Sequence, residues 1–86
     1  MRKIIKVSVP EYRKLHIVFD DGTQGMVRID DMFIGVAQPL TDPQWFATAK
    51  VIDEGYAIGF EGCEYDICSS WIYAQIVPSM SKVSVM

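Results

Sequence analysis

The residues of this sequence whose types are best suited to chemistry are a single histidine and two cysteines. His16 lies in an alternating run that turns its side chain away from the apolar face of its strand, and no sequence neighbour would orient it for catalysis. Cys63 and Cys68 are five positions apart, which matches neither the redox motif Cys-x-x-Cys nor the paired spacing of structural zinc sites. We therefore expect a solvent-facing histidine, two buried and reduced thiols, and no catalytic residue, metal or cofactor.

Carboxylates are the next candidates, and they form two adjacent pairs, Asp20-Asp21 and Asp30-Asp31. General acid–base catalysis needs carboxylates placed across a cleft in different environments, and neighbours on a turn do not meet that need. Turn formation and helix capping account for both pairs. Asp66 differs because it lies between an apolar strand and the expected start of a helix, and we favour a capping role for it. The sequence holds no motif for phosphate binding, serine catalysis or zinc proteolysis.

Aromatic residues are frequent around Asp66. Because each aromatic side chain buries a large area, most of them belong to the core, whereas an exposed group of them would mark a partner site. Tyr65 directly precedes Asp66, and Tyr73 follows within the next predicted helix. We therefore name Tyr65, Asp66 and Tyr73 as candidate contacts for a ligand or a partner.

The element that organises the chain is a predicted β-hairpin from Lys14 to Asp31. Its two alternating apolar runs are joined by Asp20-Asp21-Gly22, and a three-residue loop there gathers the apolar side chains on one face. That loop also puts Gly22 at a left-handed position, where glycine carries no Cβ penalty. The predicted pairs are Phe19 with Thr23, Ile17 with Gly25, and Leu15 with Val27.

A first strand is predicted before the hairpin, over Lys3 to Val9. Ile5, Val7 and Val9 alternate with polar residues, so they should share its buried face. Pro10 should close the strand because it has no N–H to donate. Together with the hairpin, this strand gives a three-stranded antiparallel meander.

Two short helices and a second hairpin are predicted in the remainder. We expect a helical turn over Asp30 to Phe33 and a loop over Gly35 to Gln38. The whole pattern predicts one α+β domain over residues 1–86, an antiparallel β-meander plus a second hairpin with two short helices packed on one face. The later elements are a helix capped by Thr41 or Asp42, a hairpin of Val51-Ile52 with Tyr56 to Phe60, a strand over Cys63 to Asp66, and a helix capped by Ser69 or Ser70 that stops near Pro78.

Composition narrows the classes of function. The 86 residues carry a net charge of −3, and half of them are hydrophobic, as in an ordinary globular domain. No apolar run approaches the ~20 residues of a membrane span, and the first residues lack the apolar region of a signal peptide. We expect a cytoplasmic protein. An acidic chain without a basic stripe is poorly suited to binding nucleic acid through phosphates.

Five short motifs follow one another in an order that resembles a small bacterial family known as domain of unknown function 2442. The resemblance spans about residues 3–75, with Gly59-Phe60-Glu61 standing where the family commonly has an aromatic-Pro pair, and Ile72 replacing a leucine. The motifs are Phe19-Asp20-Asp21-Gly22, Ile29-Asp30, Pro39-Leu40-Thr41-Asp42 before Phe46, Tyr65-Asp66, and Ile72-Tyr73.

The resemblance implies a small α+β fold with no assigned catalytic residue. It also implies, for some members, pairing with a small neighbouring protein in a toxin–antitoxin-like system. The helix-turn-helix that other members carry is not expected here, because the chain ends soon after Tyr73.

Our leading hypothesis is a non-enzymatic protein–protein interaction module. The segment Met80 to Met86 alternates like a strand, so it is expected to pair with its own sheet or with a second copy in a homodimer. Two alternatives stay open. One is an antitoxin-like partner of a small neighbouring protein, and the other is a small-ligand-binding domain or enzyme with a site near Asp66.

Overall fold

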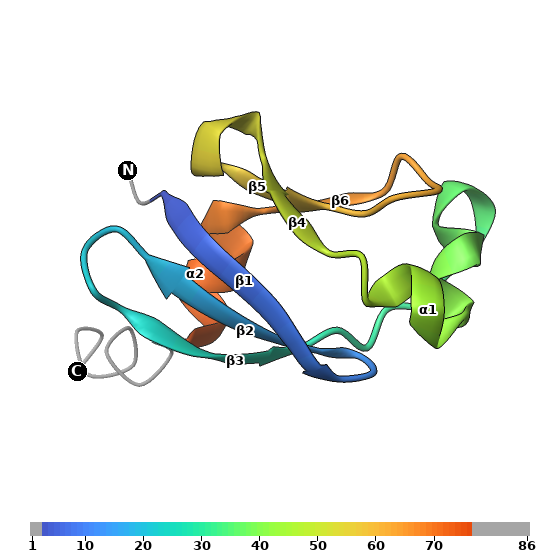
Figure 1. The fold of residues 1–86 in the computed structure, drawn as a ribbon, viewed down its shortest axis with the longest axis horizontal. Coiled ribbons are helices and arrows are strands. Elements are labelled where there is room, and N and C mark those ends of the chain that lie inside the picture. The colour runs from blue at the N-terminus through green and yellow to red at the C-terminus, as the bar shows by residue number, and fades with distance from the viewer. Residues whose placement is uncertain (1–2, 77–86) are drawn as a thin grey trace, which may run out of the picture.

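Two three-stranded antiparallel sheets form the body of the computed structural model, which describes residues 3–76. The strand orders are β1-β2-β3 and β4-β5-β6, and β1 contacts β4 where the two sheets meet (Figure 1). The predicted α+β class is confirmed. The elements are β1 (Ile4–Glu11), β2 (Lys14–Phe19), β3 (Gln24–Arg28), the 3₁₀ helix η1 (Gly35–Thr41), α1 (Pro43–Phe46), β4 (Lys50–Ile52), the 3₁₀ turn η2 (Asp53–Gly55), β5 (Ala57–Gly59), β6 (Asp66–Cys68) and α2 (Ser69–Ile76).

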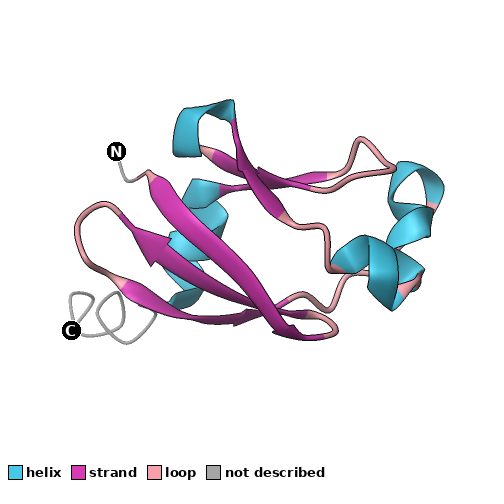
Figure 2. Ribbon diagram, viewed as in Figure 1, coloured by secondary structure: helices cyan, strands magenta, loops and turns pink. Residues whose placement is uncertain are grey.

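The helices lie at different places around the sheets. Figure 2 shows η1 and α1 together at one end of the molecule, whereas α2 lies beside the first sheet and contacts both β3 and β6. Buried side chains from the two sheets and both α-helices form one apolar cluster. No helix within residues 3–76 is long and apolar enough to cross a membrane.

The predicted register of the β2–β3 hairpin is confirmed. Leu15 pairs with Val27 and Ile17 with Gly25, and the Phe19 N–H donates to the Thr23 carbonyl at 2.8 Å. At the tip, Gly22 has a φ of +88°, a left-handed value that glycine adopts without a Cβ penalty. The alternation of the sequence and the glycine of the turn were sufficient to place this hairpin.

The predicted buried face of β1 is correct at Val7 and Val9, which pack against the core, and wrong at Ile5. A bulge between Ile4 and Lys6 shifts the pairing by one residue, so Ile4 is 2% exposed and Ile5 is 62% exposed. The strand also continues through Pro10 to Glu11. Proline is tolerated there because β1 is an edge strand and a second register shift falls at this point.

The segment after β3 also differs from the prediction. Residues 29–34 are irregular, not helical, and the region predicted as a loop forms η1 instead. Ala37 and Leu40 are both buried and three positions apart, which is the spacing that puts two side chains on one face of a 3₁₀ helix. Burial of these two residues against the core therefore decides the local structure.

The first α-helix begins as predicted. The Asp42 carboxylate accepts the Gln44 N–H at 2.9 Å, and Pro43 occupies the first turn, where its missing N–H costs nothing. Phe46 is fully buried, while Trp45 remains partly exposed.

The third strand of the second sheet starts later than predicted. Cys63 to Asp66 was the predicted span, but β6 covers Asp66–Cys68, so Asp66 pairs with Gly59 in the sheet instead of capping a helix. The helix that follows is confirmed, although Ser69 is its first residue and donates its N–H to the Tyr56 carbonyl at 2.8 Å. The predicted stop near Pro78 and the strand-like segment Met80 to Met86 lie outside the described residues.

The β4–β5 turn contains backbone strain that a substitution should relieve. Asp53 and Glu54 have φ values of +52° and +58°, a region that costs a non-glycine residue about 1–2 kcal/mol. We expect Glu54→Gly to raise the free energy of unfolding by about 0.5 kcal/mol in urea titrations, after allowance for the entropy of glycine in the unfolded chain. The exposed Glu64, which has no positive φ, is the control: Glu64→Gly should lower stability. An equal decrease in the free energy of unfolding in both variants would show that residue 54 is not strained.

Candidate functional site

A pocket of about 260 Å³ opens between the segment that follows β3 and the strand β6 with the start of α2. Its walls carry two carboxylates and two aromatic rings over apolar residues from both sides. Ile29 and Asp31 come from the first side, and Tyr65, Asp66, Ile67 and Trp71 from the second.

Strand β6 lines this pocket with all three of its residues. It is the last strand in the order β4-β5-β6, so one of its edges pairs with β5 and the other has no strand partner within residues 3–76. Ile67 is buried, while Asp66 and Cys68 are exposed, as the alternation of a strand requires. The Asp66 carboxyl and the Cys68 thiol therefore project on the same face of β6.

A hydrogen bond between two distant residues joins the pocket walls. The Tyr65 hydroxyl donates to the Asp31 carboxylate at 2.5 Å, across 34 positions of sequence. The Tyr65 ring is held by Phe33 and Phe60, whose ring centroids lie 5.9 Å and 6.3 Å from its own. Burial raises the pKa of Tyr65 well above its usual range, and the Asp31 hydrogen bond and the charges of Asp31 and Asp66 raise it further. Tyr65 is thus a protonated donor facing two carboxylates.

The dependence of the free energy of unfolding on pH above about 10 tests this hydrogen bond. Since the folded state raises the pKa of Tyr65 above its ordinary value of about 10, the stabilisation is complete below pH 10 and is lost as the pH rises further. The difference in ultraviolet absorbance between the native protein and Tyr65→Phe reports the ionisation of Tyr65, which should occur above the ordinary range of a tyrosine. Ionisation of Tyr65 at its ordinary pH of about 10 would contradict the hydrogen bond.

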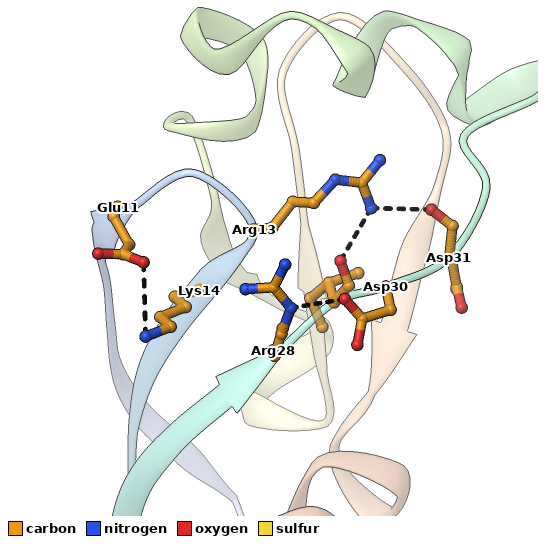
Figure 3. Close-up of polar contacts among 7 residues, drawn as sticks. Glu11, Arg13, Lys14, Arg28, Asp30 and Asp31 are labelled. Carbon is orange, nitrogen blue, oxygen red and sulfur yellow. Dashed lines mark hydrogen bonds and ion pairs between the residues drawn. The ribbon is translucent and has the colours of Figure 1, made fainter.

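Arg13 fixes the wall that carries Asp31. Its Nη1 donates to the carbonyls of Ile29 and Asp31, each at 2.9 Å, as Figure 3 shows for Asp31. Its guanidinium lies 4.4 Å from the centroid of the Phe33 ring and 5.3 Å from that of Tyr12. The carbonyls of Ile29 and Asp31 are therefore bound by the Arg13 side chain, and the segment is irregular where a helical turn was predicted.

The structure brings together two of the three residues named from the sequence. Tyr65 and Asp66 both line the pocket, whereas Tyr73 lies over the β2–β3 hairpin. There the Tyr73 ring packs edge-on against Phe19 at 5.0 Å, and its hydroxyl donates to the Asp21 carboxylate at 3.2 Å. Tyr73 thus joins α2 to the tip of the hairpin.

Sequence reasoning missed Asp31 and Trp71 as pocket residues. Asp31 was assigned to turn chemistry together with Asp30, but the two side chains have different partners. Asp30 pairs with Arg28 at 2.7 Å (Figure 3), whereas Asp31 accepts the Tyr65 hydroxyl. No sequence signal separates the two aspartates, because the difference depends on a partner far along the chain.

The two cysteines differ in exposure. Both are free thiols, but Cys63 is half-buried and Cys68 is exposed, so the prediction of two buried thiols is wrong for Cys68. The alternation of β6 explains the exposure of Cys68: its neighbour Ile67 faces the core, so Cys68 points to the opposite side. Within residues 3–76 no group of three or more histidine, cysteine, aspartate or glutamate residues is placed to bind a metal ion.

The histidine lies where the sequence placed it, on the face of β2 opposite the core. His16 Nε2 is 3.2 Å from the Gln24 side-chain oxygen on the neighbouring strand. Neither His16 nor Gln24 lines the pocket, whose residues come from other segments.

Chemically, the pocket offers acceptor oxygens from two carboxylates beside an indole and a phenol ring. Such a surface can bind a donor group and shield its apolar part from water. Comparisons of the chain with family models, with curated proteins and with solved structures found no match.

Proposed function

We propose that this chain is a non-enzymatic interaction module that binds a partner protein over the pocket beside β6. The observation that carries the proposal is a group of exposed apolar side chains directly beside the pocket wall. Met32 and Ile34 follow Asp31 in the chain and are 80% and 70% exposed, while Phe33 between them is buried. Exposed apolar side chains bordered by polar groups are typical of partner sites.

The pocket chemistry favours binding over catalysis. A general base must accept a proton near the working pH, but the pKa of Tyr65 is raised, so its hydroxyl stays protonated at neutral pH. Asp31 already accepts that hydroxyl, which leaves it positioned as a binding group. A ligand-binding or enzymatic role at Asp66 remains the alternative hypothesis.

The resemblance to domain of unknown function 2442 supports a choice of first partner. Some members of that family pair with a small protein from a neighbouring gene, so we propose the adjacent gene product as the first protein to test. This choice would make the chain an antitoxin-like partner. A homodimer through Met80 to Met86 is a separate proposal, which the mass of the purified protein in solution would test.

Photo-crosslinking tests the proposed binding surface and identifies the partner in the same experiment. A photoreactive amino acid at position 32 should give a discrete adduct in the native cell, and mass spectrometry identifies the adducted protein. The purified partner should then bind Met32→Ser/Ile34→Ser at least ~10-fold more weakly than the original chain, a loss of about 1.4 kcal/mol. The matched control is Ile5→Ser, which removes a similarly exposed apolar side chain from β1. No adduct at position 32, or an identified partner with unchanged affinity, would overturn the proposal.

A further inference from the structure

We infer that the pocket receives the side chain of an arginine, carried by an extended segment of the partner that lies along the outer edge of β6. This inference rests on the proposed function and adds the chemistry of the partner. Three independent features of the described residues support it: unbalanced charge, the size and aromatic walls of the pocket, and the outer strand edge.

Charge is the first feature. Residues 20–66 contain ten acidic and two basic side chains, a net charge of −8. Those two basic residues already have partners, since Arg28 pairs with Asp30 and Lys50 with Glu61, each at 2.7 Å. Within residues 3–76, neither Asp31 nor Asp66 forms an ion pair, although both line the same pocket. Arg13 donates to the backbone carbonyl of Asp31 and forms no ion pair with its carboxylate, so a cation from another molecule could pair with both carboxylates.

The size and walls of the pocket favour one long side chain. Its volume of about 260 Å³ lies below the roughly 300–1,000 Å³ of sites for whole small molecules. Trp71 and Tyr65 present aromatic surface on which a planar guanidinium can stack, and carboxylates can accept its N–H groups. Arginine fits this combination better than lysine, because an ammonium neither stacks as a plane nor binds a carboxylate through two parallel bonds.

The third feature is the outer edge of β6, where the backbone of the partner segment can bind. Three consecutive residues of β6 line the pocket, and the edge of β6 opposite β5 has no strand partner within residues 3–76. An extended segment can add to such an edge through main-chain hydrogen bonds while alternate side chains enter adjacent pockets. An arginine on the added segment would then enter between Asp66 and Asp31.

Three short peptides test the inference with the full-length chain. The probes are acetyl-Val-Arg-Val-amide, the same peptide with lysine, and the same peptide with citrulline, which keeps the shape of arginine without its charge. In a Trp45→Phe background the fluorescence of Trp71 reports occupancy, since the chain has two tryptophans. In a Cys63→Ser background, slower labelling of the Cys68 thiol reports the same event, because Cys68 is an exposed residue of the pocket.

The expected order of affinity is arginine, then lysine, then citrulline, with at least a tenfold loss for citrulline. Asp66→Asn should weaken the arginine peptide about tenfold, whereas Glu54→Gln, the same charge change on the exposed β4–β5 turn, should change its affinity less than threefold. Citrulline binding as well as arginine, equal effects of the two charge variants, or no peptide binding at millimolar concentration would overturn the arginine assignment. In each of those cases an adduct at position 32 would still support the proposed partner surface. The test of the arginine pocket is therefore separate from the test of the proposed function.

Discussion

Gly55→Ala should lower the free energy of unfolding by about 3 kcal/mol in urea titrations, for a change of one methyl group. Gly55 is buried at the end of η2 with a φ of +102°, outside the range that L-residues normally adopt. A Cβ at this position would lie 2.9 Å from the Lys3 Cβ and 3.0 Å from the Ile4 carbonyl oxygen. Backbone strain contributes about 1–2 kcal/mol of the loss and the collision about 1–3 kcal/mol.

Gly22→Ala is the matched control for this prediction. Gly22 has a similar φ of +88°, but no heavy atom lies within 4 Å of its ideal Cβ position. Its substitution should therefore cost only the backbone strain, about 1–2 kcal/mol. The difference between the two variants measures the collision at Gly55, and equal losses would show that the β4–β5 turn does not pack tightly on β1.

The contact at Gly55 matters beyond stability because it joins the two sheets. The turn before β5 rests on the start of β1, and β1 also contacts β4. One wall of the pocket follows the first sheet, and the other wall belongs to the second sheet. A shift of the sheets at Gly55 should therefore change the separation of Asp31 and Asp66, so Gly55→Ala should also weaken the arginine peptide more than Gly22→Ala does.

The parts of the fold that could be predicted from sequence are those specified by neighbouring residues. The register of the β2–β3 hairpin follows from the alternation of its apolar residues and from the glycine of its turn, and the Asp42 cap follows from a carboxylate two positions before an unpaired N–H. The bulge at Ile5 has no such local signal. Burying Ile4 instead of Ile5 satisfies the core that surrounds β1, and that core is formed by residues distant in sequence.

The candidate site was predicted only where its residues are adjacent in sequence. Tyr65 and Asp66 stand together in the chain and in the pocket, but Asp31 reaches them across 34 positions through the hydrogen bond to Tyr65. Arg13 was missed for a different reason. Its acceptors are the backbone carbonyls of Ile29 and Asp31, which every residue possesses, so residue type carries no information about them.

Arg13→Ala should lower the free energy of unfolding by about 2 kcal/mol. It should also weaken the hydrogen bond between Tyr65 and Asp31 that joins the pocket walls. The substitution removes two hydrogen bonds to carbonyls and the stacking of the guanidinium on Phe33 at 4.4 Å, each worth about 0.5–1 kcal/mol. It also frees the backbone that carries Asp31. We therefore expect the Tyr65–Asp31 hydrogen bond to weaken, and the raised pKa of Tyr65 to fall toward its ordinary value.

Two further variants separate the side chain of Arg13 from its backbone. Arg28→Ala removes an exposed arginine that pairs with Asp30, and it should cost less than 1 kcal/mol without moving the Tyr65 titration. Arg13→Gly loses the same side chain as Arg13→Ala, but it relieves the φ of +70° at this position and should be about 1 kcal/mol more stable. If Arg13→Gly is more stable than Arg13→Ala but the pKa of Tyr65 stays lower than in the original chain, then the arginine side chain positions Asp31. If Arg13→Gly restores both the stability and the pKa of Tyr65, then the backbone turn at position 13 positions Asp31 without the side chain.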